Sequence, residues 1–385
     1  MNKNLKLTAA ALSIAGLASA GAHAAEVKAY GVVDVGLAFV SSDADAAGSS
    51  RTNTFSMETA REFGSRFGLR SSEDLGDGLR IDWVLESGFR ADDGTFDQTG
   101  KFFGRESHID LTGPFGKVSA GLMPIFGSTL GADGLFRAID PLFANYTQAF
   151  GSGQVTASSW TRVDNAVSFV TPTFAGFTGY AMYAFKKAAS DAGDEGRGGD
   201  TDRYASIAAR WQAGALETVV VADTTMYGSA RTGEKAFTDD GWTVTVGGNY
   251  TFPGGARLLA FTQLFGGQEL AVHRAGVGRT GLTLLTAGQP AAGYGFVDGF
   301  GASLGVNVPA MGGVAKAAVA YRDMDNRYGT DFRRVCLSAG YDYAITKRTA
   351  VYAMTGWSRE KIETTGGVEG APNGYELTCG VVHRF

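Results

Sequence analysis

The sequence has little of what disulfide-rich secreted proteins and metalloenzymes depend on. Its 385 residues include two cysteines, four histidines and eight prolines. Two cysteines do not make a disulfide framework, and the histidines show no spacing typical of a metal site. Basic residues are also the minority, with 34 Lys and Arg against 39 Asp and Glu. This balance argues against nucleic acid as a partner.

Long apolar segments are scarce as well. Apart from the run at residues 7–17, nothing approaches the roughly 18 apolar residues that a transmembrane helix needs. That run follows Lys3 and Lys6 and precedes Ala22-His23-Ala24, which has the form of a signal-peptidase site. We therefore predict a cleaved signal peptide over residues 1–24. Its removal leaves 32 basic and 39 acidic residues, a net charge of −7.

Glycine is abundant instead, at 56 residues, and 11% of the chain is aromatic. Between glycine-containing turns the residues alternate between apolar and polar, which is typical of β-strands with one apolar face. In residues 242–252 the apolar face has aromatic residues at both ends, and threonine, glycine and asparagine form the other face. Residues 375–385 alternate in the same way and end on Phe385. This last segment alone would also fit the edge strand of a soluble domain.

The whole chain favours a different fold, because sixteen such segments alternate between short glycine turns and long polar loops. A sheet that spans a membrane must close on itself, since lipid cannot solvate free backbone groups; the last strand must then pair with the first. The sequence predicts an all-β fold, a single 16-stranded antiparallel transmembrane β-barrel over residues 25–385, with short periplasmic turns, long extracellular loops and a water-filled interior. The predicted strands are 27–40, 65 to the turn at 75–78, 79–89, 102–112, 117–123, 162–171, 177–186, 202–212, 215–226, 242–252, 256–265, 296–308, 314–323, 332–344, 348–358 and 375–385.

Several segments resemble the general diffusion porins of Gram-negative bacteria, in particular those of beta-proteobacteria. They are Tyr30 to Asp34, Ser65 to Gly76, Phe115 to Gly121, Asn165 to Tyr183, Gly340 to Thr349 and the final His383-Arg384-Phe385. The resemblance extends over nearly the whole mature chain. It implies a homotrimeric barrel in the outer-membrane lipid that lets small hydrophilic solutes and ions diffuse passively, with no cofactor and no chemical step.

Two other functions remain as alternatives. A substrate-specific uptake channel would have the same barrel and differ in its loops. An outer-membrane barrel enzyme would need a nucleophile beside His108, and no positioned serine is evident. Gly301-Ala302-Ser303-Leu304-Gly305 matches the G-x-S-x-G of serine hydrolases. That motif requires a strand–turn–helix elbow, whereas here it falls inside a predicted strand, so we interpret the match as chance.

The longest gap between predicted strands, residues 124–161, is the candidate for a loop that narrows the pore. It is rich in glycine and proline, carries apolar residues that need a wall to pack on, and contains the acids Asp133 and Asp140. The resemblance implies that this third loop folds into the barrel, and that pore arginines stand at Arg66 and Arg162.

Strand alternation adds further candidates for the barrel interior. Arg66 and Arg70 alternate with outward Phe67 and Leu69, and Arg162 shares the parity of Ser168. Glu106 and His108 alternate with outward Ile109, as does Asp110, whereas Arg105 has the wrong parity unless a bulge shifts it. We expect wall bases to face loop acids across the constriction. Alternation also places Cys336 inside the barrel and Cys379 outside it, so both thiols should be free.

Overall fold

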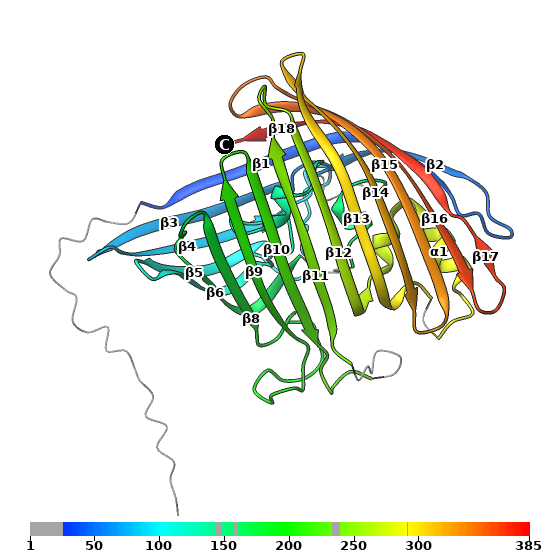
Figure 1. Cartoon of the computed structure of the whole chain (residues 1–385), viewed down its shortest axis with the longest axis horizontal. Helices are drawn as coiled ribbons and strands as arrows, with labels where there is room; N and C mark the ends of the chain where they lie inside the picture. Colours follow the sequence, from blue (N-terminus) through cyan, green and yellow to red (C-terminus); the bar gives the residue numbers. More distant parts are fainter. Residues whose placement is uncertain (1–25, 143–147, 158–160, 233–238, 291) are drawn as a thin grey trace, which may run out of the picture.

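The chain forms one antiparallel sheet that closes into a barrel (Figure 1). The computed structural model describes residues 26–142, 148–157, 161–232, 239–290 and 292–385. The predicted signal peptide, residues 1–24, lies outside the described residues. Successive strands are hydrogen-bonded neighbours, as expected for hairpins joined by short turns.

Sixteen long strands make up the wall, which confirms the predicted fold. They are β1 (Lys28–Asp43), β3 (Arg66–Gly76), β4 (Leu79–Gly88), β5 (Glu106–Gly113), β6 (Gly116–Pro124), β7 (Arg162–Val170), β8 (Phe177–Ala184), β9 (Arg203–Ala213), β10 (Leu216–Met226), β11 (Gly241–Thr251), β12 (Arg257–Leu270), β13 (Gly295–Ala310), β14 (Gly313–Asn326), β15 (Thr330–Ala344), β16 (Thr349–Thr364) and β18 (Asn373–Arg384).

The barrel closes where the sequence predicts, between the first and last strands. The β1–β18 ladder runs from Val32 opposite Arg384 to Asp43 opposite Asn373. Phe385 extends it, because its backbone N–H and carbonyl each bond to Gly31 at 3.1 Å. With this closure neither the first nor the last strand has a free edge, which a membrane could not solvate.

Two further strands add no new position to the sixteen. β17 (Glu369–Gly370) pairs with β16. β2 (Thr52–Thr59) pairs with residues 35–42 of β1, and β3 pairs with residues 28–32 of the same strand. β2 and β3 therefore share one position in the barrel, interrupted by residues 60–65. The predicted strands leave residues 41–64 as a polar loop, and strand β2 within them corrects that expectation.

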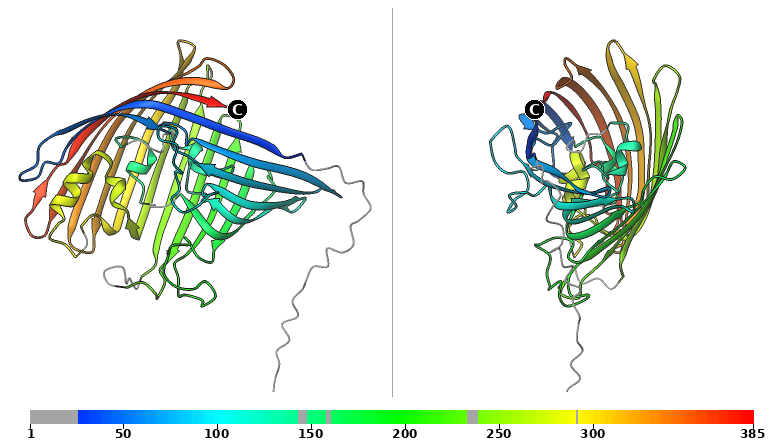
Figure 2. Two further views of the ribbon diagram at one scale, coloured as in Figure 1. Left: turned by 180° about the vertical axis from the view of Figure 1, so that it is seen from behind. Right: turned by 90° about the vertical axis from the view of Figure 1, so that its left-hand side faces the viewer.

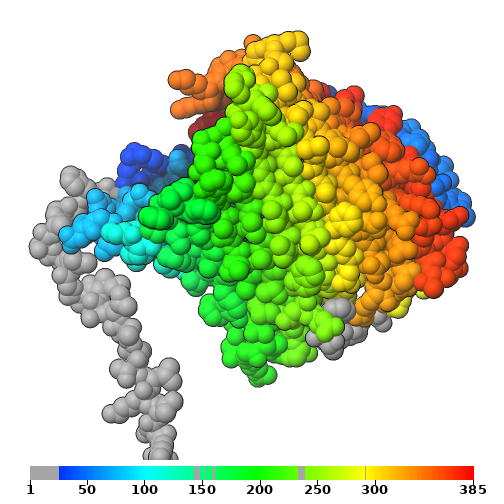
Figure 3. Space-filling view, in the orientation of Figure 1, coloured from blue at the N-terminus to red at the C-terminus, as the bar shows by residue number. Residues whose placement is uncertain are grey.

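The two faces of the wall differ as the alternation predicts. Outward side chains on β9, β11, β12 and β15 are exposed and apolar, and include Ile207, Val246, Leu264 and Leu337. In the orientation of Figure 1, strands β8 to β16 present a continuous outer surface (Figure 3). Inward positions on β11 are polar instead, with Thr243, Thr245 and Asn249 all buried. This is the arrangement that lipid outside and water inside require.

The connection between β12 and β13 is more ordered than a polar loop. β12 continues past a bulge to Leu270, and two short helices follow, η4 (Val272–Gly278) and α1 (Arg279–Leu285). They lie within the barrel, against the inner side of the wall (Figure 2). None of the helices in the described part of the chain is long and apolar enough to cross a membrane.

Both cysteines are free, as predicted. Cys336 is 2% exposed and packs in the apolar cluster on the inner wall. Cys379 is exposed and lies on β18 between outward Leu377 and Val381.

Candidate functional site

The long connection between β6 and β7 folds back inside the barrel. We call residues 125–161 loop 3; its described parts include the short helices η1 (Leu135–Ala138) and η2 (Ser152–Gln154). Phe126 and Ile139 of this loop are fully buried with wall residues such as Val221. The rings of Phe136 and Phe261 stack at 6.2 Å. Burial of these apolar side chains against the wall is the main force that holds the loop in place.

Hydrogen bonds from wall residues fix the position of loop 3 along the barrel axis. The Asn249 side chain donates to the carbonyl of Ala138 at 2.8 Å. The backbone N–H of Ala157 donates to the Gln263 side chain at 2.7 Å. Each bond satisfies a backbone group that would otherwise be buried without a partner.

The G-x-S-x-G match has a structural explanation here. It lies on β13, without an elbow. A Cβ on Gly301 would lie 1.9 Å from the carbonyl oxygen of Val155, and one on Gly305 would lie 2.5 Å from the ring of Pro141. Only glycine lets loop 3 approach the wall this closely. Both glycines thus serve packing, not catalysis.

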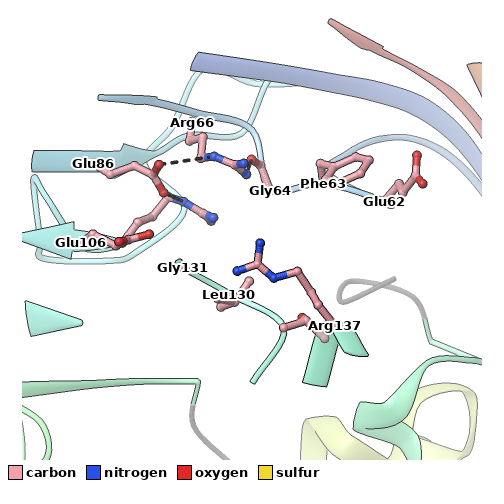
Figure 4. A pocket seen from close by; sticks show the side chains of 11 residues that line it. Glu62, Phe63, Gly64, Arg66, Glu86, Glu106, Leu130, Gly131 and Arg137 are labelled. Carbon is pink, nitrogen blue, oxygen red and sulfur yellow. Dashed lines mark hydrogen bonds and ion pairs between the residues drawn. The ribbon is translucent and has the colours of Figure 1, made fainter. Parts of the chain in front are cut away.

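Loop 3 leaves a cavity of about 190 Å³ between itself and β3, β4 and β5. We call it the first cavity. It is lined by Glu62, Phe63, Gly64, Arg66, Glu86, Arg105, Glu106, Thr129, Leu130, Gly131 and Arg137. Three arginines and three glutamates face one another, and Figure 4 shows Arg137 pointing from the loop toward the wall residues.

Glu86 organises the wall side of the first cavity. Its carboxylate contacts Arg105 at 2.7 Å and Arg66 at 3.4 Å, and it accepts a bond from the Tyr30 hydroxyl at 2.9 Å. Arg66 also donates to the carbonyl of Gly64 at 2.9 Å. Such charge-assisted contacts hold the guanidinium groups in fixed directions.

Residues 60–65 complete the wall because Asp34 holds them in the barrel. One Asp34 carboxylate oxygen accepts the backbone N–H groups of Glu62 and Phe63, at 3.0 and 2.7 Å. The other accepts the Tyr352 hydroxyl from β16 at 2.7 Å. Asp34 thus anchors the segment that interrupts the second barrel position.

On the loop side, Arg137 is the exposed charge. It has no ion-pair partner among the residues that the structure describes. Desolvation beside the wall lowers the pKa of its guanidinium, and the charges of Glu106 and Asp133 oppose that effect. Arg137 therefore stays available to a negatively charged solute.

The structure brings some of the predicted site residues together. Arg66 and Glu106 line the first cavity. His108 lies next along β5, with its ring nitrogens 3.2 Å from Glu106 and 2.8 Å from Asp110. Arg70 faces inward but lies outside this cavity, over the Tyr30 ring at 5.0 Å.

The other predicted residues are placed differently. Asp133 pairs with Lys117 of β6 at 2.5 Å. Asp140 is buried and accepts the backbone N–H of Leu142. Arg162 precedes a register shift between β6 and β7, which lies between Val163 and Ala166, and its neighbour Val163 packs in the inner cluster. The shift breaks the alternation that linked Arg162 to Ser168, so its part in the constriction stays a prediction.

Alternation keeps Arg105 out of the barrel interior unless a bulge shifts it, and it does not single out Arg137, Glu86 or Glu62. The expected parity of Arg105 is wrong because β5 begins at Glu106, and the Arg105 backbone N–H bonds to the Glu86 carbonyl just beyond the regular ladder. Glu86 could have been found, since it alternates with Leu85 on β4. Arg137 gave no signal, because its position depends on how the whole loop folds.

Among the described residues, no group of His, Cys, Asp or Glu has the arrangement of a metal site.

Known proteins match the chain over most of its length. The family model described as Gram-negative porin matches residues 8–363. An outer membrane porin protein of Bordetella pertussis is 30% identical over 92% of this chain and 94% of its own. Outer membrane porin protein 32 of Delftia acidovorans is 28% identical over 97% and 99%.

Solved structures agree on the fold. The anion-selective porin from Comamonas acidovorans superimposes with a TM-score of 0.68 at 24% identity, covering 94% of this chain and all of that one. OmpT of Vibrio cholerae, in a trimer form, gives 0.61 at 16% identity, with 94% and 99% covered.

Proposed function

The chain belongs to the Gram-negative porin family, and we propose that loop 3 and the first cavity form the constriction that selects which solutes pass. The protein is an outer-membrane channel for passive diffusion and not an enzyme. In such barrels the short turns face the periplasm and the long loops face outward. Loop 3 lies inside the barrel, against its inner wall. A solute that crosses the barrel therefore passes loop 3.

The position of Arg137 is the observation that carries this proposal. The predicted arrangement has acids on the loop and bases on the wall. Asp133 is neutralised by Lys117 and Asp140 is buried, which leaves Arg137 as the loop charge beside the first cavity. The wall opposite contributes Arg66 and Arg105, with Glu86 shared between them. Bases on both sides favour a weak preference for anions, moderated by the nearby glutamates.

We extend two further properties to this chain. One similar structure is described as anion-selective and another as a trimer. The arginines around the first cavity are consistent with anion selectivity. Outward Val33 and Val35 of β1, with Gly31, are consistent with a trimer, because small and β-branched side chains allow two walls to pack closely. We propose a homotrimer in the outer-membrane lipid that passes small hydrophilic solutes and ions.

Reversal potentials in a salt gradient test the constriction. Arg137→Glu reverses the charge of a side chain without an ion-pair partner in the described part of the chain, so the fold should survive. We expect its anion/cation permeability ratio to fall several-fold, and Arg66→Glu to act in the same direction. Arg197→Glu makes the same change on an exposed extracellular loop and should leave the ratio unaltered. Equal ratios in wild type and Arg137→Glu would remove loop 3 from the selectivity filter.

A further inference from the structure

A second cavity, of about 260 Å³, lies on the other side of loop 3. It is lined by Ala132, Gly134, Leu135, Arg137, Ala138, Tyr180, Arg210, Glu217 and Arg257. Arg257 is the first residue of β12, and Arg210 and Glu217 flank the short turn between β9 and β10. The second cavity therefore lies toward the periplasmic end of the barrel.

The charges of the second cavity are not balanced, since three arginines face a single glutamate. Both oxygens of that Glu217 are occupied, one by Arg210 at 2.6 Å and the other by Asn249 at 3.0 Å. Glu217 and Arg210 thus neutralise each other. Arg257 and Arg137 have no ion-pair partner within the described part of the chain.

Arg137 also lines the first cavity, so the two cavities meet at its side chain. A guanidinium group presents a planar fork of N–H donors that matches a carboxylate or phosphate group. The Tyr180 hydroxyl can add a further donor. An anion that leaves the first cavity next meets two arginines without an ion-pair partner among the described residues.

We propose that the second cavity is a binding site for small oxyanions, carboxylates or phosphate, held by Arg137 and Arg257 on their way to the periplasm. The inference rests on the proposed function, namely that solutes pass loop 3, and deepens it. Anions bind twice in succession, and Arg137 transfers them from one cavity to the next. Because the second cavity has the larger excess of positive charge, it should bind anions more tightly than the first cavity.

Conductance measured against salt concentration reveals a binding site in the channel. In potassium phosphate and in potassium succinate, the wild-type conductance should level off as the concentration rises, because occupied sites limit the flux. Arg257→Gln should raise the half-saturating concentration by about tenfold, a factor that corresponds to about 1.4 kcal/mol. Arg257→Lys keeps the charge without the planar fork of N–H donors. Its half-saturating concentration should lie between those of wild type and Arg257→Gln.

Two controls separate this proposal from the one on which it rests. Lys347→Gln removes a charge from an exposed periplasmic turn outside the cavity and should leave saturation unaltered. Ohmic conductance in potassium chloride shows that each variant folds and that the channel is open. A wild-type conductance that stays linear in both oxyanion salts, or an unaltered half-saturating concentration in Arg257→Gln, overturns the second site. The effect of Arg137→Glu on the reversal potential would stand in either case.

Discussion

At the scale of single residues, glycine decides how closely loop 3 can approach the wall. The carbonyl oxygen of Val155 occupies the space that a Cβ on Gly301 would need, at 1.9 Å. A backbone atom cannot rotate away as a side chain can, so in Gly301→Ala the loop itself must move. Overpacking of this kind costs about 1–3 kcal/mol. We expect a lower unfolding temperature, measured on heat-modifiability gels, and noisier single-channel currents.

A second strand glycine provides the matched control. A Cβ on Gly179 of β8 would approach only the Thr171 side chain, at 3.3 Å, and that side chain can adjust. Gly179→Ala should therefore behave as wild type. If Gly301→Ala unfolds at the same temperature as Gly179→Ala, close packing of loop 3 does not depend on this glycine.

Single residues also show where sequence reasoning ends. Inward Glu106 and outward Leu377 follow from a period of two, which depends only on neighbours along one strand. Arg105 breaks that rule because it stands just before β5, where the regular ladder stops. Arg137 lies in a loop with no period at all. Its place between two cavities is set by contacts such as Phe136 on Phe261, far apart in the sequence.

At the scale of elements, the long loops are joined by ion pairs at the outer end of the barrel. Arg231, in the β10–β11 connection, contacts Asp202 at 2.8 Å and Glu269 of β12 at 2.7 Å, and it lies over the Tyr227 ring. Burial alone would raise the pKa of Asp202, but bonds from Arg231 and Gly228 and the charge of Lys187 bring it below its ordinary value.

We expect Arg231→Met to loosen these loops. Asp202 is buried but Arg231 and Glu269 are only partly so. The loss should therefore cost more than the ~0–1 kcal/mol of an exposed pair and less than the ~3–5 kcal/mol of a fully buried one, and backbone amides near Asp202 should exchange hydrogen faster at pH 7. Because the folded-state pKa of Asp202 is lowered, its contribution is present above the unfolded-state pKa and is lost as pH falls through the folded value. The difference between variant and wild type should therefore shrink below about pH 3.8, the ordinary value.

An exposed pair on the outer wall provides the comparison. Arg333 and Glu363 lie 3.3 Å apart with both side chains in solvent, and such pairs contribute about 0–1 kcal/mol. Arg333→Met should leave the exchange rates of the loops unaltered. Equal rates in Arg231→Met and wild type would mean that the ion pairs do not hold the loops.

The elements themselves were predicted to differing degrees. Every wall strand was found, because alternation recurs in each and glycine turns separate them. The helices η4 and α1 were not found, since each has only seven residues. Segments this short are not stable alone and depend on packing. Here that packing comes from segments distant in the sequence, as where Gly281 lies against Pro372, just before β18.

At the scale of the whole molecule, the outer surface must serve both lipid and neighbouring subunits. Placing Arg at Val33 should cost about 2–4 kcal/mol in either setting, because a charge at mid-membrane is disfavoured by lipid and by a packed apolar interface alike. Substitution by arginine thus does not distinguish a lipid-facing surface from a subunit interface. Substitution by a large apolar residue does, because fluid lipid accommodates the added volume and a close-packed protein interface does not.

Val33→Trp and Val246→Trp together test the trimer. Val33 lies on β1, opposite His383 of β18, whereas Val246 lies on β11, in the exposed apolar wall. If β1 packs against another subunit, Val33→Trp should lose the trimer band on a native gel while Val246→Trp keeps it. Both monomers should still conduct in planar bilayers, because each barrel closes within one chain. A trimer band that survives in Val33→Trp would mean that this part of β1 faces lipid, and that subunits meet elsewhere on the wall.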